Sequence, residues 1–427
     1  MKSAQSPTSR WLVAIIAVFT LLSLGYSFAT KLRYGPDEPA HFIYVKSLAT
    51  KLSPPPISTT ETHSEDSASS HEGHQPPLYY ALMAIPFALL KALGASVDTI
   101  WRVMRLLNIP IGIAWIWCVY SLGRVFFDDD KKKALAATAF VALLPTGVYQ
   151  AGVISNDVLT ALLFTWAIIP ILSFFKTENM SIKSAALAGL LIGLAILTKA
   201  QGLVLVPAFL AAALLVWRRR NYAGTGEIAR ITTVAMGTAV LVSGWWFAWC
   251  WSTYGALIPH SLYNPVLPNG LTPLLFAPAA TAKLMWFITS QTYGHFFIPY
   301  WLVEQHIGDW ANYFYPLCVL TALILAGLVI SYKRRDNVDW RALWFMLFVV
   351  AVMFAVYVRY ILVVDFMAKQ QGRLFLPAAS VVGMVWVLGI GGWLRSARIK
   401  IAGLTAGLVL MLLCNLVIIS SAIAMYH

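Results

Sequence analysis

Uncharged apolar runs of about 17 to 25 residues recur along the chain, separated by short polar segments. A run of this length crosses the roughly 30 Å hydrocarbon layer of a bilayer as an α-helix. Backbone groups in hydrocarbon must be hydrogen-bonded within the protein, and runs this long do so as helices rather than as barrel strands. The pattern therefore predicts an all-α polytopic membrane protein. We predict about eleven transmembrane helices, near residues 11–30, 101–126, 134–154, 158–175, 184–198, 202–217, 231–251, 313–332, 342–363, 374–394 and 401–423.

Basic residues orient such a chain, because Lys and Arg near helix ends prefer the cytoplasm. With residue 1 inside, the basic clusters at 131–133, 218–220, 333–335 and 395–400 all fall inside. The apolar segment 78–94 would reverse this order if it crossed fully, and its length and central proline disfavour a straight span. We predict a re-entrant or interfacial helix there, in a first external loop at 31–100; whether the segment crosses fully stays open.

Composition agrees with this topology: 59% of the 427 residues are hydrophobic and 11% are charged. The formal net charge of +13 lies in short loops at helix ends, so it indicates orientation and not a nucleic-acid partner. The four cysteines are scattered singly, which suggests neither disulfides nor a thiolate metal site. The first apolar run precedes small residues that a signal peptidase accepts, but it is longer than a signal core, so we predict an anchor. We treat residues 1–427 as a single integral-membrane domain.

The first external loop carries polar clusters at both ends. Asp37 and Glu38 follow the first span directly, and adjacent carboxylates at a membrane surface need a cation, a metal ion or a proton to compensate them. The alternative is that both are first-turn acids of a helix beginning near His41. His74 stands before two prolines at the other end. Between them, the Ser-, Thr- and His-rich segment 53–74 predicts a mobile loop.

Three further external turns carry candidate groups. Asp157 lies between two spans, where it is also a good helix cap. Lys199 follows the span at 184–198. Gln371 and Arg373 precede the span at 374–394; an arginine beside a glycine at a helix N-terminus can bind phosphate, although it can also extend along the interface.

Two other stretches have weaker signals. Residues 252–312 are rich in Trp and Tyr, with several histidines and acids, and predict an external interfacial lid, although a membrane-interface belt explains the aromatic residues. Histidines and acids within 61–74 are of the types that ligate divalent metals, but their spacing matches no tight motif. We predict that His63 and His71 belong to a flexible hydrophilic loop.

Five short motifs stand in order on the predicted external face. They are Pro36-Asp37-Glu38-Pro39-Ala40-His41, His74-Gln75-Pro76-Pro77-Leu78-Tyr79-Tyr80, Asn156-Asp157, Leu197-Thr198-Lys199 and Gln371-Gly372-Arg373-Leu374-Phe375-Leu376-Pro377. Together they resemble the GT-C superfamily of integral-membrane glycosyltransferases over nearly the whole chain. The resemblance is strongest to the bacterial branch related to protein O-mannosyltransferases and the lipid A aminoarabinose transferase.

The resemblance implies an enzyme that transfers a sugar, with inversion, from a polyprenyl-phosphate donor to a glycan, lipid or protein acceptor. It places the reaction on the periplasmic or exterior face of a bacterial inner membrane. Asp37 matches the catalytic base of the first external loop. The implied catalytic residues are Asp37, Glu38 and Asp157, and the implied substrate- or phosphate-binding residues are His41, His74, Lys199, Gln371 and Arg373. A divalent metal cofactor is left open, with Asp37, Glu38, Asp157 and His74 as its candidate ligands.

Two other classes of function fit a polar membrane face. A lipid-linked glycan transporter or flippase should carry charged groups deep within its spans, whereas the polar residues here gather at one surface. A non-catalytic partner in envelope polysaccharide assembly should tolerate neutralisation of Asp37 and Asp157.

Overall fold

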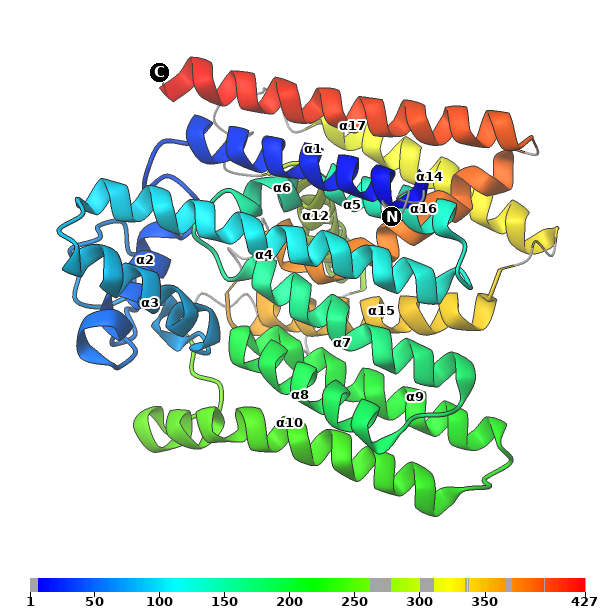
Figure 1. Cartoon of the computed structure of the whole chain (residues 1–427), viewed down its shortest axis with the longest axis horizontal. Coiled ribbons are helices and arrows are strands. Elements are labelled where there is room, and N and C mark those ends of the chain that lie inside the picture. Colours follow the sequence, from blue (N-terminus) through cyan, green and yellow to red (C-terminus); the bar gives the residue numbers. More distant parts are fainter. Residues whose placement is uncertain are drawn as a thin grey trace, which may run out of the picture.

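The computed structural model describes residues 7–261, 278–299, 311–334, 336, 338–365, 371–394 and 396–426. Across these residues the regular elements are helices, apart from one isolated β-bridge between Ile57 and Ser70. The long helices run side by side as a bundle, and two shorter helices lie across one end of it (Figure 1). The predicted all-α polytopic fold is confirmed.

Nine helices of the described residues are long and apolar enough to cross a membrane. They are α1 (Pro7–Ala29), α4 (Val97–Phe126), α7 (Asp157–Thr177), α9 (Leu205–Arg219) with the preceding η2 (Ala200–Val204), α10 (Thr225–Tyr254), α14 (Ala311–Lys333), α15 (Trp340–Val363), α16 (Ala379–Trp393) with the preceding η4 (Gly372–Ala378), and α17 (Ala397–Tyr426).

The other two predicted spans deviate from straight crossing helices. The third predicted span is divided into α5 (Lys131–Ala142) and α6 (Pro145–Ala151), which meet at 67° and make a tenth crossing if counted together. Pro145 explains the break, because it has no N–H to donate and its ring excludes a continuous helix. The fifth is α8 (Ile182–Thr198), whose 17 residues extend only about 25 Å.

A buried amide side chain forms a hydrogen bond with the backbone at the break between α5 and α6. Asn415 of α17 is fully buried and donates to the carbonyl of Leu143 at 2.8 Å. Its side-chain oxygen accepts from the hydroxyl of Tyr26 in α1 at 3.1 Å. One side chain thus connects three helices and satisfies a carbonyl that the break releases.

Hydrogen bonds at both ends of α7 show that the loops separate into two groups. At one end, Lys176 donates to the carbonyls of Val125 and Phe126, and Arg219 donates to Phe175. At the other end, Asn156 donates to the carbonyl of Thr198, so α8 runs back along α7. The basic turns after α4 and α9 therefore share one end, and the turns before α7 and after α8 share the other.

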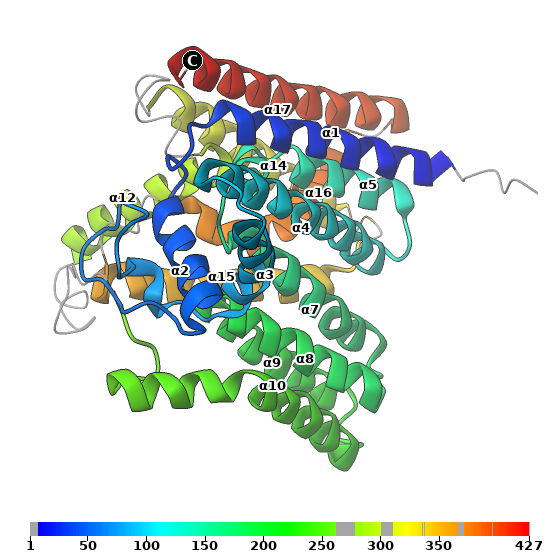
Figure 2. The same ribbon diagram turned by 60° about the vertical axis from the view of Figure 1, so that its left-hand side comes forward.

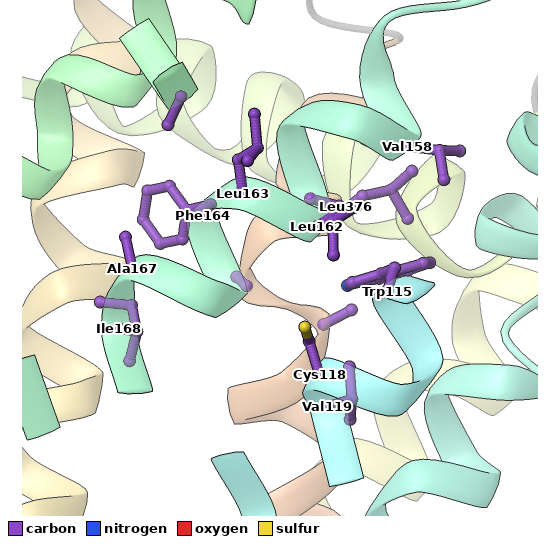
Figure 3. Close-up of a cluster of buried hydrophobic side chains, with 14 of the residues drawn as sticks. Trp115, Cys118, Val119, Val158, Leu162, Leu163, Phe164, Ala167, Ile168 and Leu376 are labelled. Atoms are coloured by element: carbon purple, nitrogen blue, oxygen red, sulfur yellow. The ribbon is translucent and has the colours of Figure 1, made fainter. Parts of the chain in front are cut away.

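The packing of α4 against α7 forms much of the buried core. Figure 3 shows Trp115 and Cys118 of α4 near Leu162 and its neighbours on α7, with Leu376 of η4 beside Leu162. Trp115 and Leu376 are fully buried. This contact fixes η4 against the two spans and so determines where the polar residues at its start lie.

The segment between α1 and α4 folds over one end of the bundle. It contains α2 (Glu38–Lys51), η1 (His71–His74) and α3 (Leu78–Ala92), and α2 and α3 lie together at one end of the bundle, beside the end of α4 (Figures 1 and 2). At 15 residues, α3 is shorter than a full span. The helices predicted for this segment are therefore present, and its place outside the membrane stays a prediction.

The segment 53–74 is anchored, which corrects the predicted mobile loop. The hydroxyl of Ser70 donates to the carbonyl of Ala40 at 2.9 Å, and the carbonyl of Ser70 accepts from Ser58 at 2.9 Å. Glu65 accepts two hydrogen bonds from Arg33, each of 2.8 Å. These contacts attach the segment to α2 and to the end of α1.

The predicted lid at 252–312 lies partly outside the described residues. Its described part includes α12 (Pro278–Phe297), which packs against η4. The lid function stays a prediction.

Candidate functional site

Asp37 turns its carboxylate away from the helix that it precedes. It occupies the N-cap position of α2 with φ 54° and ψ 15°, a left-handed conformation that Asp tolerates better than most residues, and its side chain does not cap the helix. Instead, one carboxylate oxygen contacts the guanidinium of Arg373 and the other lies 3.3 Å from Nε2 of His71. The side chain is 19% exposed.

Arg373 of η4 joins the turn before α2 to the start of α7. Its guanidinium contacts Asp37, lies 3.4 Å from the carbonyl of Pro36, and lies 3.5 Å from Oδ2 of Asp157. The preceding Gly372 allows this position, because a Cβ there would overlap the backbone of α12 at His295 and Phe296. Nε of Arg373 is buried with no hydrogen-bond partner among the described residues.

Asp157 and Lys199 form the second ion pair of the site. Nζ of Lys199 lies 2.6 Å from Oδ1 of Asp157 and 3.4 Å from Oδ1 of Asn156. Ser155 donates to the other oxygen of Asp157 at 3.0 Å. Both acids of the site are therefore matched by a cation, with Arg373 lying between them.

The Arg373 contact controls the ionisation of Asp37. Burial alone would raise the pKa of the Asp37 carboxyl, but the charge of Arg373 and the hydrogen bond from His71 outweigh burial and hold that pKa well below its usual range. Asp37 is therefore ionised and strongly held when no other anion competes for Arg373.

Glu38 lies apart from these residues, in a second buried ion pair. Its carboxylate receives two 2.6 Å hydrogen bonds from Arg105 of α4 and one each, at 3.0 Å, from the backbone N–H groups of Gly35 and Ile154. Arg105 also donates to three backbone carbonyls at the end of α1 and just beyond it. Neither side chain of the pair is exposed. This arrangement joins α1, α2 and α4 and leaves Glu38 no lone pair directed at Asp37.

Three of the predicted binding residues lie around the cluster and differ in their burial and hydrogen bonds. His41 is buried, and its Nδ1 lies 2.9 Å from the hydroxyl of Tyr80. His74 is partly buried, and its Nδ1 donates to the carbonyl of His71 at 2.7 Å. Burial lowers the pKa of both imidazoles. Gln371 is half-buried at the N-cap of η4, two residues before Arg373.

The structure places three further residues in this region that the sequence analysis does not assign to the site. His71 and Glu72 were assigned to a flexible loop, but both are buried beside Asp37. Arg105 lay within a predicted span, and a charged residue there needs a buried acid as partner. That signal was available in the sequence, whereas the fold of the segment 53–74 was not.

In the part of the chain that the structure describes, the four candidate metal ligands from the sequence do not form one ligand group. Glu38 and Asp157 are occupied by cations, and Nδ1 of His74 is occupied by a carbonyl. Among the described residues, a possible ligand group is Asp37, His71 and Glu72, with one ligand atom from each within 4.8 Å of the others. Nδ1 of His71 accepts the backbone N–H of Thr62 at 2.9 Å, so its proton resides on Nε2 and that nitrogen has no lone pair for a metal. The donor set therefore fits a divalent metal poorly.

Comparisons with solved structures agree with the helical architecture. The archaeal oligosaccharyltransferase AglB from Archaeoglobus fulgidus, in complex with an inhibitory peptide and a dolichol-phosphate, superimposes with a TM-score of 0.53 at 13% identity, over 98% of this chain and 56% of that one. The arabinosyltransferase EmbB from Mycobacterium smegmatis gives a TM-score of 0.51 at 14% identity, over 93% of this chain and 32% of that one. The chain thus spans little more than half the length of AglB. No curated protein matches the chain.

The architecture is therefore that of an all-helical polytopic membrane protein, and its helices are arranged as in these solved structures. Within that class, the chain belongs to the family described as "Predicted membrane protein (DUF2142)", whose family model matches residues 46–382.

Proposed function

We propose that this protein transfers a sugar from a polyprenyl-phosphate donor to an acceptor at the non-cytoplasmic face of a bacterial inner membrane. The observation that carries the proposal is the convergence of Asp37, Asp157, Lys199 and Arg373, from four separate segments, at one end of the bundle. The solved AglB structure with dolichol-phosphate supports a lipid phosphate as the kind of ligand that this fold accepts.

The cations are suited to a departing lipid phosphate. Nε of Arg373 is a buried donor without a partner, and a phosphate oxygen would supply one. Lys199 is 13% exposed and adds a second positive charge nearby. Stabilising the negative charge that develops on the leaving group is the contribution that these two side chains would make.

The proposed base is Asp37. In an inverting transfer the acceptor oxygen forms a bond to the anomeric carbon, its proton passes to Asp37, and the bond from that carbon to the phosphate oxygen breaks with its electron pair leaving on the lipid phosphate. A phosphate that binds the guanidinium of Arg373 offsets part of the positive charge that holds the pKa of Asp37 low. Donor binding would therefore raise that pKa and make Asp37 a stronger base.

The distribution of charge supports the proposed side of the membrane. The basic turns after α4 and α9 lie at the end opposite to Asp37 and Asp157, as the contacts of Lys176 and Arg219 indicate. Since Lys and Arg favour the cytoplasm, the site would face the periplasm or the exterior.

A transporter receives less support. Arg105 lies within a candidate span, but it is fully engaged with Glu38 and three carbonyls, so it offers no charge to a passing substrate.

The test compares transfer of radiolabelled sugar from polyprenyl-phosphate donors in membranes that hold equal amounts of wild type, Asp37→Asn or Asp66→Asn. Asp66 is 89% exposed in the same external segment and serves as the matched control. We expect Asp37→Asn to lose about a hundred-fold or more of the transfer rate, and Asp66→Asn to keep it. Full transfer by Asp37→Asn would show that another group takes the proton.

A further inference from the structure

Glu72 lies in a short turn whose position is fixed. Its backbone N–H donates to the hydroxyl of Ser70 at 3.1 Å, and that hydroxyl donates to the carbonyl of Ala40 in α2. A Cβ on the next residue, Gly73, would lie 2.8 Å from the carbonyl oxygen of Pro55, so the turn presses closely on the preceding backbone. The side chain of Glu72 is consequently directed inward, and the residue is 8% exposed.

The carboxylate of Glu72 is incompletely satisfied. Its Oε2 is buried with no hydrogen-bond partner among the described residues, which is costly for a charged group. A carboxylate oxygen of Glu72 lies within 4.8 Å of Asp37 and His71. The two cations of the site, Arg373 and Lys199, form their ion pairs with the other two acids.

The neighbouring histidines direct their hydrogen bonds elsewhere. His71 accepts from Thr62 through Nδ1, and its Nε2 faces Asp37. His74 donates from Nδ1 to the carbonyl of His71. His41 uses Nδ1 for the hydroxyl of Tyr80. Among the described residues these rings supply no donor to the free oxygen of Glu72, and a bound molecule would supply one.

The distance between the carboxylates of Asp37 and Glu72 restricts what that molecule can be. Two oxygens within 4.8 Å can both contact one small group, but a hydroxyl has a single proton and can donate to only one of them. Two hydroxyls on neighbouring carbons supply two donors at this spacing. A metal cation is disfavoured, because Nε2 of His71 carries a proton and the guanidinium of Arg373 contacts Asp37.

We propose that Glu72 binds the acceptor of the reaction, and that this acceptor is a carbohydrate with hydroxyl groups on neighbouring carbons. The inference rests on the proposed function. One acceptor hydroxyl gives its proton to Asp37 as its oxygen attacks the anomeric carbon, while the adjacent hydroxyl donates to Glu72, which takes no proton. A serine or threonine side chain, with one hydroxyl, satisfies only one of the two acids.

The experiment measures acceptor binding without any donor. Saturation-transfer difference NMR on the full-length protein in lipid nanodiscs is recorded with a panel of methyl pentosides and methyl hexosides, and with N-acetylserinamide as the single-hydroxyl probe. We expect at least one glycoside to bind wild type and to lose about ten-fold or more in affinity with Glu72→Gln, because a hydrogen bond to a charged group is lost. Glu61→Gln, at an exposed position in the same segment, should bind like wild type.

A second comparison varies the glycoside and begins with wild type. For the glycoside that binds, analogues lacking one of two neighbouring hydroxyls are measured with wild type. Removal of the hydroxyl that faces Glu72 should weaken binding to wild type about ten-fold and cause no further loss in Glu72→Gln, as in a double-mutant cycle.

Three results would overturn the proposal: absence of glycoside binding by wild type, equal binding by wild type and Glu72→Gln, or stoichiometric Mn²⁺ binding by electron paramagnetic resonance that disappears in Glu72→Gln. The last result would assign the carboxylate to a cation. Failure of the proposed function is distinguished separately, since full sugar transfer by Asp37→Asn would refute the base and leave glycoside binding by Glu72 unaffected.

Discussion

Replacement of Glu38 by glutamine tests whether this residue supports the fold or takes part in the chemistry. Glutamine keeps the shape of the side chain but removes the charge that faces Arg105. Both side chains of the pair are 0% exposed, so water cannot replace the lost partner. Removing one member of a buried ion pair typically costs about 3–5 kcal/mol, because the other charge stays buried.

The hydrogen bonds around Glu38 add to this cost. The carboxylate accepts from Arg105 and from the N–H groups of Gly35 and Ile154, whereas the amide of glutamine turns one accepting oxygen into a donor. A donor facing another donor costs on the order of 1 kcal/mol or more. We therefore expect the free energy of unfolding to fall by about 4–6 kcal/mol.

The assay is unfolding by sodium dodecyl sulfate in mixed micelles, followed by tryptophan fluorescence. Asp98→Asn is the matched control. Asp98 lies on α4, as Arg105 does, and forms an ion pair with Arg33 in which the Asp98 side chain is 62% exposed. Its replacement should therefore change stability by about 1 kcal/mol or less. The double variant Glu38→Gln with Arg105→Gln should recover part of the loss, since it removes the uncompensated charge. If Glu38→Gln is as stable as Asp98→Asn yet abolishes sugar transfer, the structural interpretation is refuted and the catalytic prediction from the sequence is favoured.

Three other predictions concern the site and its side of the membrane. Asp37→Asn should bind farnesyl phosphate about five-fold more tightly than wild type, because the carboxylate no longer competes for Arg373; unchanged or weaker binding by isothermal titration calorimetry would contradict this. Gly372→Val should lower the unfolding free energy by about 2 kcal/mol or more, since its side chain would overlap the backbone of α12, and a wild-type transition in the detergent assay would rule out the contact. In a cysteine-free background, Ser64→Cys should react with an impermeant maleimide on intact cells and Lys132→Cys should not; the reverse pattern would invert the proposed topology.

The helical fold could be predicted from the sequence because membrane spans are set by length and hydropathy. Nine predicted spans are long, apolar helices. Pro145 marks the break in the sequence, but the residue that satisfies the released carbonyl was harder to predict, because Asn415 comes from a distant helix. Neither hydropathy nor local propensity contains that contact.

The site was partly predictable for a related reason. Once the topology is drawn, Asp37, Asp157, Lys199 and Arg373 fall on one face, and the structure brings their side chains together. The sequence did not separate Asp37 from Glu38, because the left-handed backbone at Asp37 directs the two carboxylates to different partners. It also gave no sign that the polar segment 53–74 would be packed, since its anchors are hydrogen bonds of Ser70 and Glu65 to residues distant in the sequence.

The amide of Asn415 has a consequence for synthesis of the chain. The carbonyl that it satisfies lies 272 residues earlier, at Leu143. At a translation rate of about 5–20 residues per second, roughly 14–54 seconds separate the two residues at the ribosome. During that interval the bent third crossing has left the translocation channel with an unmet backbone acceptor, which water or an insertase must satisfy in place of α17. Variants at position 415 should therefore reduce the yield of inserted protein more than they reduce the stability of molecules that have already assembled.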